Sequence, residues 1–225
     1  MVYLSIISHT PIDLINADLD DFVSWLQSPG IYGRSFATKD ERNAKCGLIS
    51  AVLYSDTSRK AVDAQYMNGI WLDFEDGDLS ATELPKLFPE YRMVICNSYR
   101  HTKNKQRFHA FLPFTETISA EFQASIFDLF VQKLRDAGYY TPRGKGRPPK
   151  NVLRSGLDTS KRELGRTMFY LPCQAADPEQ SFFIDYKDGR ILCDAHTWIE
   201  NSAVPPVYQP EPIIVEEQRP VNQEA

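Results

Sequence analysis

The segment MNGIWLDFE, residues 67–75, constrains the fold of this chain most, because its two faces differ in chemistry. In an extended strand, side chains at positions i and i+2 lie on the same face. One face would carry only apolar side chains, those of Ile70, Leu72 and Phe74. The other face would carry Trp71 followed by two carboxylates, Asp73 and Glu75. The segment therefore predicts a strand with a core on one side and a chemical site at its end.

Other segments predict further strands and two helices. Strand patterns occupy residues 47–54, 93–99, 107–114 and 165–172, and a hairpin with its turn at Asp188 and Gly189 is expected within residues 182–193. Helical spacing marks residues 19–26 and, most strongly, residues 119–137, where Ser119 is a good N-cap and Gly138 ends the pattern. Strands and helices alternate without a repeating unit, which indicates an α+β (mixed α/β) layered fold.

Composition separates a folded part from a tail. Residues 1–202 are expected to form one folded domain, whereas residues 203–225 carry five prolines and little periodic pattern, typical of a Pro-rich tail or linker. The chain has 25 basic and 30 acidic residues, a net charge of −5, so overall charge alone does not indicate a nucleic-acid partner.

The expected compartment is the cytoplasm. No leader peptide or membrane-spanning stretch is apparent, so no membrane partner is expected. The four cysteines, which lie far apart and form no C-x-x-C pair, are expected to be buried free thiols. They are Cys46, Cys96, Cys173 and Cys193.

Asp73 and Glu75 are candidate metal ligands. Two carboxylates about 6–7 Å apart on one strand face repel each other, and a divalent cation relieves that repulsion. Hard oxygen ligands favour Mg²⁺ or Mn²⁺, and no zinc is expected. A calcium loop does not fit the spacing. The alternative is a strand end with solvated acids.

The segment NSYRHTKNKQRFHAFLPF adds a candidate anion site. In a hairpin, His101 and Arg107 would converge on one anion, with the arginine as a fork for phosphate oxygens. His109 is expected to be a packed sheet histidine. The alternative is a surface hairpin with an incidental histidine.

Further along, Asp158 and Arg166 are candidates for a third carboxylate and a further phosphate contact. An ordinary turn is the alternative at Asp158. The acid-free segment TPRGKGRPPKNVLR is a candidate nucleic-acid grip, with a solvated loop as its alternative. Its cations are Arg143, Lys145, Arg147, Lys150 and Arg154.

From about residue 69 to residue 172 the sequence resembles the archaeo-eukaryotic primase superfamily. The shared order is an acid-x-acid pair ending a strand, a histidine followed by R-F and a strand ending in proline, then an aspartate with a later arginine and F-Y-L-P. One position departs from the pattern, because the family's serine two places before the histidine is Tyr99 here, and the nearest serine is Ser98. No zinc knuckle is present.

The resemblance implies a primase-polymerase core with an RRM-like sheet packed by helices, plus an N-terminal α/β part. It implies that Asp73, Glu75 and Asp158 are catalytic and bind two Mg²⁺ or Mn²⁺ ions, and that NTPs or dNTPs are contacted by His101, Arg107 and Arg166. The expected function is a template-dependent nucleotidyltransferase, a DNA/RNA primase-polymerase that makes or extends primers for plasmid or phage replication. Single-stranded DNA template and primer would be partners, with a replicative helicase reached through or beyond the tail.

Two other functions stay open. A nicking replication initiator would use a tyrosine and a histidine-held metal; Tyr139 and Tyr140 lie beside the basic segment, but His101 and His109 are too far apart for its histidine motif. A catalytically idle module would keep the fold and only bind nucleic acid. Covalent attachment to a DNA 5′ end, or salt-sensitive binding without incorporation, would distinguish them.

Overall fold

The computed structural model describes residues 2–7, 12–54, 60–141 and 151–200 of the 225-residue chain. The predicted tail at residues 203–225 lies outside the described residues, as do four cations of the predicted nucleic-acid grip, Arg143, Lys145, Arg147 and Lys150. The described part combines antiparallel sheets with flanking helices, so the predicted α+β class is confirmed.

The N-terminal sheet has the strand order β2-β1-β3-β8, and each neighbouring pair is antiparallel. Its strands are β1 (Val2–Ile7), β2 (Ile12–Ala17), β3 (Leu48–Ser50) and β8 (Phe169–Tyr170). The sequence patterns did not predict β1 and β2, and β8 is much shorter than the strand expected over residues 165–172.

The central sheet has the order β4-β5-β7-β6-β9, again antiparallel throughout. Its strands are β4 (Val52–Tyr54), β5 (Ala64–Glu75), β6 (Met93–Asn97), β7 (Arg107–Ser119) and β9 (Phe183–Tyr186). The predicted pairing of residues 93–99 with residues 107–114 is confirmed by β6 and β7. The apolar segment 47–54 is divided between the two sheets, because Ala51 separates β3 from β4.

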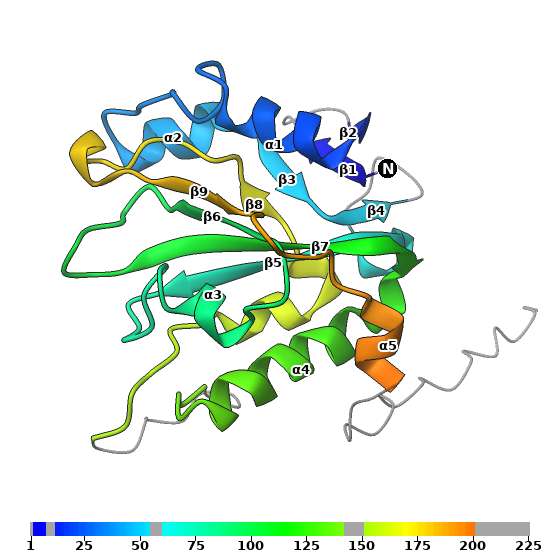
Figure 1. Ribbon diagram of the computed structural model, residues 1–225. Coiled ribbons are helices and arrows are strands. Elements are labelled where there is room, and N and C mark those ends of the chain that lie inside the picture. The colour runs from blue at the N-terminus through cyan, green and yellow to red at the C-terminus, as the bar shows by residue number, and fades with distance from the viewer. Residues whose placement is uncertain (1, 8–11, 55–59, 142–150, 201–225) are drawn as a thin grey trace, which may run out of the picture.

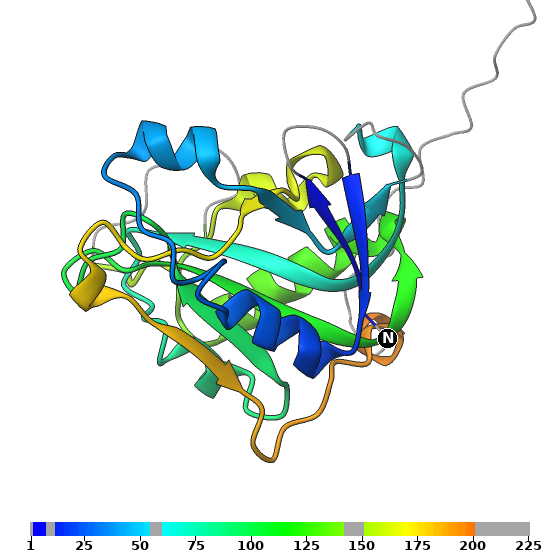
Figure 2. The ribbon, with the colours of Figure 1, turned by 90° about the horizontal axis from the view of Figure 1, so that it is seen from above.

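Helices cover the central sheet on both sides. They are α1 (Leu19–Gln27), α2 (Lys39–Lys45), α3 (Leu84–Leu87), α4 (Gln123–Asp136) and α5 (Ala195–Glu200). Short 3₁₀ turns are η1 (Ala61–Asp63), η2 (Ala120–Phe122), η3 (Thr159–Arg162), η4 (Leu164–Arg166) and η5 (Pro178–Gln180). Figure 1 shows α3, α4 and α5 on one side of the sheet, with α1, α2 and the N-terminal sheet on the other; Figure 2 gives the view from above.

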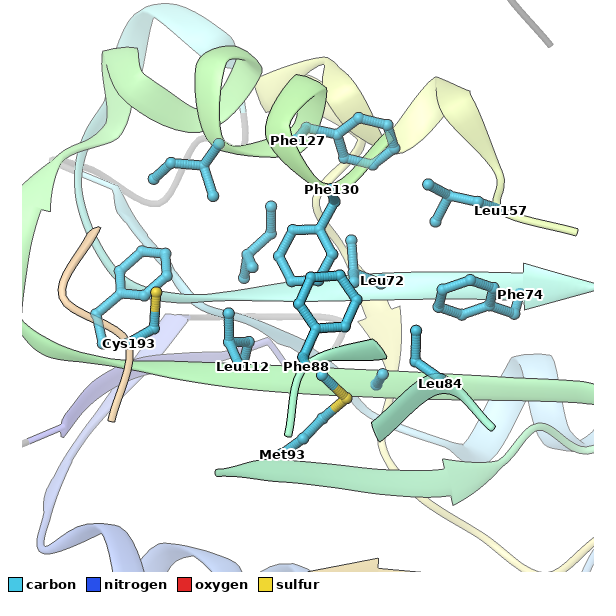
Figure 3. Close-up of a cluster of buried hydrophobic side chains, with 14 of the residues drawn as sticks. Leu72, Phe74, Leu84, Phe88, Met93, Leu112, Phe127, Phe130, Leu157 and Cys193 are labelled. Atoms are coloured by element: carbon cyan, nitrogen blue, oxygen red, sulfur yellow. The ribbon is translucent and has the colours of Figure 1, made fainter. Parts of the chain in front are cut away.

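The larger core lies between the central sheet and α4. Figure 3 shows Phe130 of α4 directed toward Leu72 of β5 and toward Phe88, with Phe127 of the same helix in the same core. Phe74 and Phe108 stack across β5 and β7 with ring centres 4.7 Å apart. The helix predicted over residues 119–137 is observed as η2 followed by α4, and it stops before Gly138, whose φ of +89° suits glycine.

The predicted hairpin within residues 182–193 is wrong. The turn exists, with Arg190 N–H donating to the Lys187 carbonyl at 3.1 Å and Gly189 at a φ of +70°. After the turn, however, the chain does not return along β9. Ile191 forms a parallel bridge with Tyr91, so the residues after the turn form their backbone hydrogen bonds with another part of the chain.

All four cysteines are buried free thiols, as predicted. Within the described ranges, no helix has the length and apolar character needed to cross a membrane.

Candidate functional site

β5 places alternate side chains on opposite faces of the central sheet, as its sequence predicts. The face toward α4 is fully apolar and carries Ile70, Leu72 and Phe74. The opposite face begins with Trp71, which stacks on Phe111 at 4.8 Å in a second apolar cluster. Asp73 and Glu75 follow on that face, where the apolar cluster gives way to polar surroundings.

Asp158 lies beside Asp73 although 85 residues separate them in the sequence. The Asp158 N–H donates to the Asp73 carbonyl at 2.8 Å, and the Glu75 N–H donates to the Gly156 carbonyl at 2.7 Å. These bonds frame an antiparallel bridge between Phe74 and Leu157. Directly opposed residues in such a ladder share a face. The three predicted acids are therefore brought to one end of β5.

Two glycines permit this close approach. A Cβ on Gly156 would lie 2.7 Å from the Gly77 Cα, and one on Gly77 would lie 2.5 Å from the Gly156 N. Gly156 also has a φ of +76°, a conformation that other residues rarely adopt. Small residues at both positions are thus a condition for the contact between Asp73 and Asp158.

Asp73 is the most perturbed acid of the site. Its side chain is 16% exposed, and its Oδ1 is buried without a hydrogen bond from the described residues. Burial raises the pKa of Asp73 from 3.8 to about 6; the positive charge of Lys161 opposes the rise and the neighbouring Asp158 adds to it. A bound cation would stabilise the charged form of such a carboxylate.

His109 faces Asp73 across β5 and β7, with its Nε2 3.5 Å from the Asp73 Oδ1. Its ring packs edge-on against Phe169 at 5.4 Å, in keeping with the expected packed histidine. Burial lowers the pKa of His109 to about 3, and the charges of Lys161 and Arg42 lower it further. The imidazole is therefore neutral at pH 7 and can act as a hydrogen-bonding neighbour of Asp73.

A cavity of about 230 Å³ opens in front of Asp73 and Glu75. His109, Phe169 and Tyr170 line it from the sheets. Among the described residues, four cationic side chains also line it, and none was singled out from the sequence: Lys39, Arg42, Arg100 and Lys161. Lys39 and Arg42 come from a segment without a recognisable motif, whereas Arg100 precedes His101 and Lys161 follows Asp158 without being motif positions. Only the fold brings these side chains together.

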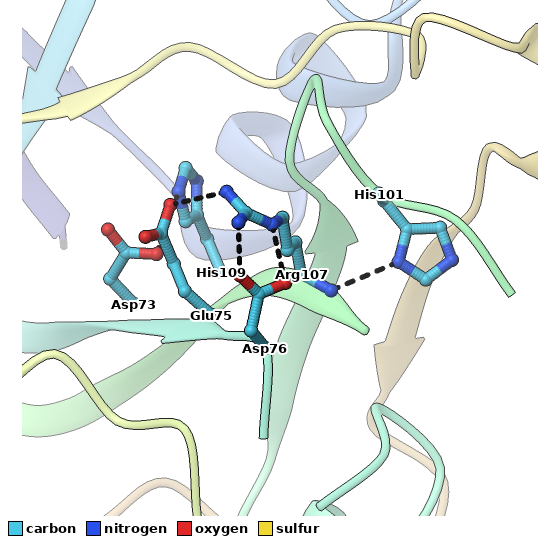
Figure 4. Close-up of polar contacts among 6 residues, drawn as sticks. All are labelled: Asp73, Glu75, Asp76, His101, Arg107 and His109. Atoms are coloured by element: carbon cyan, nitrogen blue, oxygen red, sulfur yellow. Dashed lines mark hydrogen bonds and ion pairs between the residues drawn. The ribbon is translucent and has the colours of Figure 1, made fainter. Parts of the chain in front are cut away.

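Arg107 and His101 occupy a different position from the one expected. Arg107 binds both carboxylate oxygens of Asp76 and lies 3.2 Å from the Glu75 Oε1 (Figure 4). His101 is buried, accepts the Arg107 backbone N–H at its Nδ1 at 3.2 Å, and packs on Phe182. Burial lowers its pKa. Neither residue is among those that line the cavity.

Two other predicted cations lie elsewhere. Arg166, in η4, is exposed and pairs with Glu163 at 3.1 Å. Arg154 is exposed and lies 3.7 Å from the Asp78 Oδ2.

The Asp158 carboxylate accepts from the N–H and hydroxyl of Ser160, both at 3.0 Å, so it caps η3 while lying near Asp73. Tyr139 and Tyr140 do not line the cavity.

Asp73 and Glu75 fit a hard divalent cation. They offer oxygen donors, and the Asp73 Oδ1 has no competing hydrogen bond from the described residues. No group of three His, Cys, Asp or Glu side chains in that part of the chain is arranged to hold an ion. Mg²⁺ is commonly held by one or two carboxylates together with substrate phosphates, so two acids in a cavity that is also lined by cationic side chains suit it.

Comparisons with known proteins assign no family to the chain. No protein-family model and no curated protein matches it. Among solved structures, the chain is similar to the AEP domain of the cyanophage S-2L primase-polymerase, with 10% sequence identity and a TM-score of 0.44. The match covers 88% of this chain and 86% of that one. A likeness at this level does not identify the role of any residue.

Proposed function

We propose that this protein is a metal-dependent nucleotidyltransferase that makes or extends primers on a DNA template. The observation that carries the proposal is one cavity lined by two strand-end carboxylates and four cationic side chains. Phosphoryl transfer needs both elements, since carboxylates hold cations and cationic groups neutralise the phosphates. The resemblance of the sequence motifs to the archaeo-eukaryotic primase superfamily gives the same expectation.

In the proposed reaction, the 3′-hydroxyl of a primer or first nucleotide attacks the α-phosphate of an incoming NTP or dNTP. The new P–O bond forms, the bond to the β-phosphate breaks, pyrophosphate leaves, and the hydroxyl proton passes to solvent. Mg²⁺ or Mn²⁺, when bound, would supply charge neutralisation and lower the pKa of the hydroxyl.

The chain's own residues orient these groups. Asp73 and Glu75 would hold the metal, and Asp158, which caps η3 next to Asp73, would add negative charge beside it. Neutral His109 lies next to Asp73, with its Nε2 3.5 Å from the Asp73 Oδ1. Template and primer would contact the acid-free segment TPRGKGRPPKNVLR, mainly through their phosphates, which gives little sequence preference.

Incorporation of labelled nucleotides on a single-stranded template, with each metal and each nucleotide type, tests the proposal. Asp73→Asn and Glu75→Gln keep the side-chain shape and remove the charge. We expect incorporation to fall by at least about a hundredfold, because metal binding supplies several kcal/mol to the transition state. Asp188→Asn, an exposed acid after β9, is the matched control and should retain activity. Full activity in both site variants would contradict the proposal.

A nucleic-acid-binding module without catalysis is the second candidate. The observation that favours it is the ion pair between Glu75 and Arg107, which already neutralises one of the two acids. Salt-sensitive binding to single-stranded DNA, combined with no incorporation from any nucleotide or metal, would support this candidate and exclude the enzyme.

A further inference from the structure

The cationic side of the cavity comes mainly from segments outside the acidic strand. Lys39 and Arg42 lie on α2, Lys161 lies in η3, and Arg100 follows β6. These four cations face two carboxylates, in a chain whose net charge is −5. A local excess of positive charge in a concave site attracts anions that carry several charges.

Arg42 is distinctive among the four. Its guanidinium carbon lies 3.7 Å from the centre of the Tyr170 ring and 5.8 Å from that of Tyr99. Stacking on an aromatic face holds the guanidinium plane in a restricted orientation and leaves its edge free to bind oxygens.

The Arg42 Nε is buried and has no hydrogen-bond partner among the described residues. A buried donor without a partner costs about 1–3 kcal/mol, so such donors are normally satisfied by a ligand, an ion or water. Lys161 differs, because its Nζ donates to the Met168 carbonyl at 2.9 Å and lies 4.4 Å from the Phe169 ring centre. Arg42 thus lines the cavity with its guanidinium held on Tyr170, and its Nε has no hydrogen-bond partner among the described residues.

We propose that Arg42, held on Tyr170, anchors a polyphosphate-binding subsite opposite Asp73 and Glu75. Its ligand class is a nucleoside triphosphate bound through phosphate oxygens, an identification that rests on the proposed function. Arg107 and Arg166, the arginines expected in this role, do not line the cavity: Arg107 pairs with Asp76 and Glu75, and Arg166 pairs with Glu163. The subsite thereby gives α2, in the N-terminal part of the chain, a direct part in substrate binding.

Titration calorimetry with inorganic tripolyphosphate in metal-free buffer tests the subsite without requiring catalysis. Arg42→Gln should weaken binding about 10- to 100-fold, the loss expected for a hydrogen bond to a charged group. Arg42→Lys should fall between wild type and Arg42→Gln, because a lysine cannot present the planar fork. Tyr170→Ala should also bind more weakly, because it removes the ring on which the Arg42 guanidinium stacks.

Arg34→Gln is the matched control. Arg34 belongs to the same N-terminal region and stacks on Phe36 at 5.0 Å, but it donates to the Lys45 carbonyl at 2.6 Å and does not line the cavity. It should bind tripolyphosphate as wild type. Thermal unfolding checks that each variant is folded, and Arg42→Lys with Tyr170→Ala decides the question if Arg42→Gln does not fold.

A second measurement separates phosphate binding from a structural role. In wild type, affinity should rise from a nucleoside monophosphate to the triphosphate, and in Arg42→Gln that rise should shrink. Unchanged tripolyphosphate affinity in Arg42→Gln, or no binding by wild type, would overturn the subsite. Loss of binding in Arg42→Gln, with a wild type that binds but never incorporates nucleotides, would support the subsite and contradict the proposed function.

Discussion

The two faces of β5 differ in what their side chains contribute. On the face toward α4, Leu72 and Phe74 are almost completely buried in a continuous apolar core. On the opposite face, an apolar cluster around Trp71 gives way within two residues to Asp73. One strand thus stabilises the fold through one face and supplies a candidate site through the other, because its side chains alternate.

The stability of the fold and the activity of the site should therefore respond to different substitutions along the same strand. The apolar face should govern the free energy of unfolding. The polar face should lower the stability of the fold, because Asp73 is buried there and burial disfavours its charged form. Its pKa is accordingly raised to about 6.

Phe74→Ala should give the largest loss of stability. Phe74 is 1% exposed and stacks on Phe108, so its removal leaves a cavity, with an expected cost of about 3–5 kcal/mol in the free energy of unfolding. Urea unfolding measures this cost. Val62→Ala, at a side chain that is 84% exposed, is the control and should change stability by less than about 0.5 kcal/mol. Equal effects of the two substitutions would remove the distinction between the faces.

Asp73→Asn should alter the pH dependence of stability in metal-free buffer. In wild type the folded pKa of about 6 lies above the unfolded value of 3.8, so the folded state binds more protons between these values. Stability should therefore fall as pH rises from about 4 to about 6, by up to about 3 kcal/mol. The asparagine variant should lack this fall and be the more stable protein at pH 7. Parallel curves for the two proteins would contradict the raised pKa.

Gly156→Ala tests the contact between the acids. Its positive φ and its approach to Gly77 leave no room for a methyl group, so a loss of about 1–3 kcal/mol is expected. Because the Glu75–Gly156 and Asp73–Asp158 hydrogen bonds depend on this approach, amide hydrogen exchange at Glu75 and Asp158 should speed up. Gly165→Ala, where a Cβ would meet nothing within 4 Å, is the control.

Arg166→Gln should have the smallest effect. Its partner Glu163 is 67% exposed, and exposed ion pairs contribute about 0–1 kcal/mol. Nucleotide affinity should also stay unchanged, because Arg166 does not line the cavity. A clear loss of affinity in this variant would restore the role that the sequence motif suggested.

Local patterns predicted the elements that a short stretch of sequence determines. The two faces of β5 follow from a period of two, and α4 follows from an apolar stripe between Ser119 and Gly138. The prediction of a hairpin within residues 182–193 was wrong because a D-G turn determines the bend but not the partner of the segment that follows it. Here that partner is the segment around Tyr91.

Only part of the candidate site could be predicted from the sequence. The acids were found because Asp73 and Glu75 are two residues apart, and Asp158 was placed by resemblance. Arg42 and Lys161 were missed, since they lie 31 residues before and 88 residues after Asp73 and belong to no motif. Their position depends on how the N-terminal sheet and η3 pack beside β5, and no local pattern encodes that packing.

Ala51 has a consequence for the width of the cavity. It is the single residue between β3, which pairs with β8, and β4, which pairs with β5. The chain thus crosses from the last residue of β3 to the first residue of β4 in about 7 Å. This short covalent link joins the neighbour of the strand bearing Tyr170 to the neighbour of the strand bearing the acids. Lengthening the link by a residue would let the two sheets shift apart while each kept its own hydrogen bonds, separating Asp73 and Glu75 from Tyr170 and from the Arg42 stacked on it.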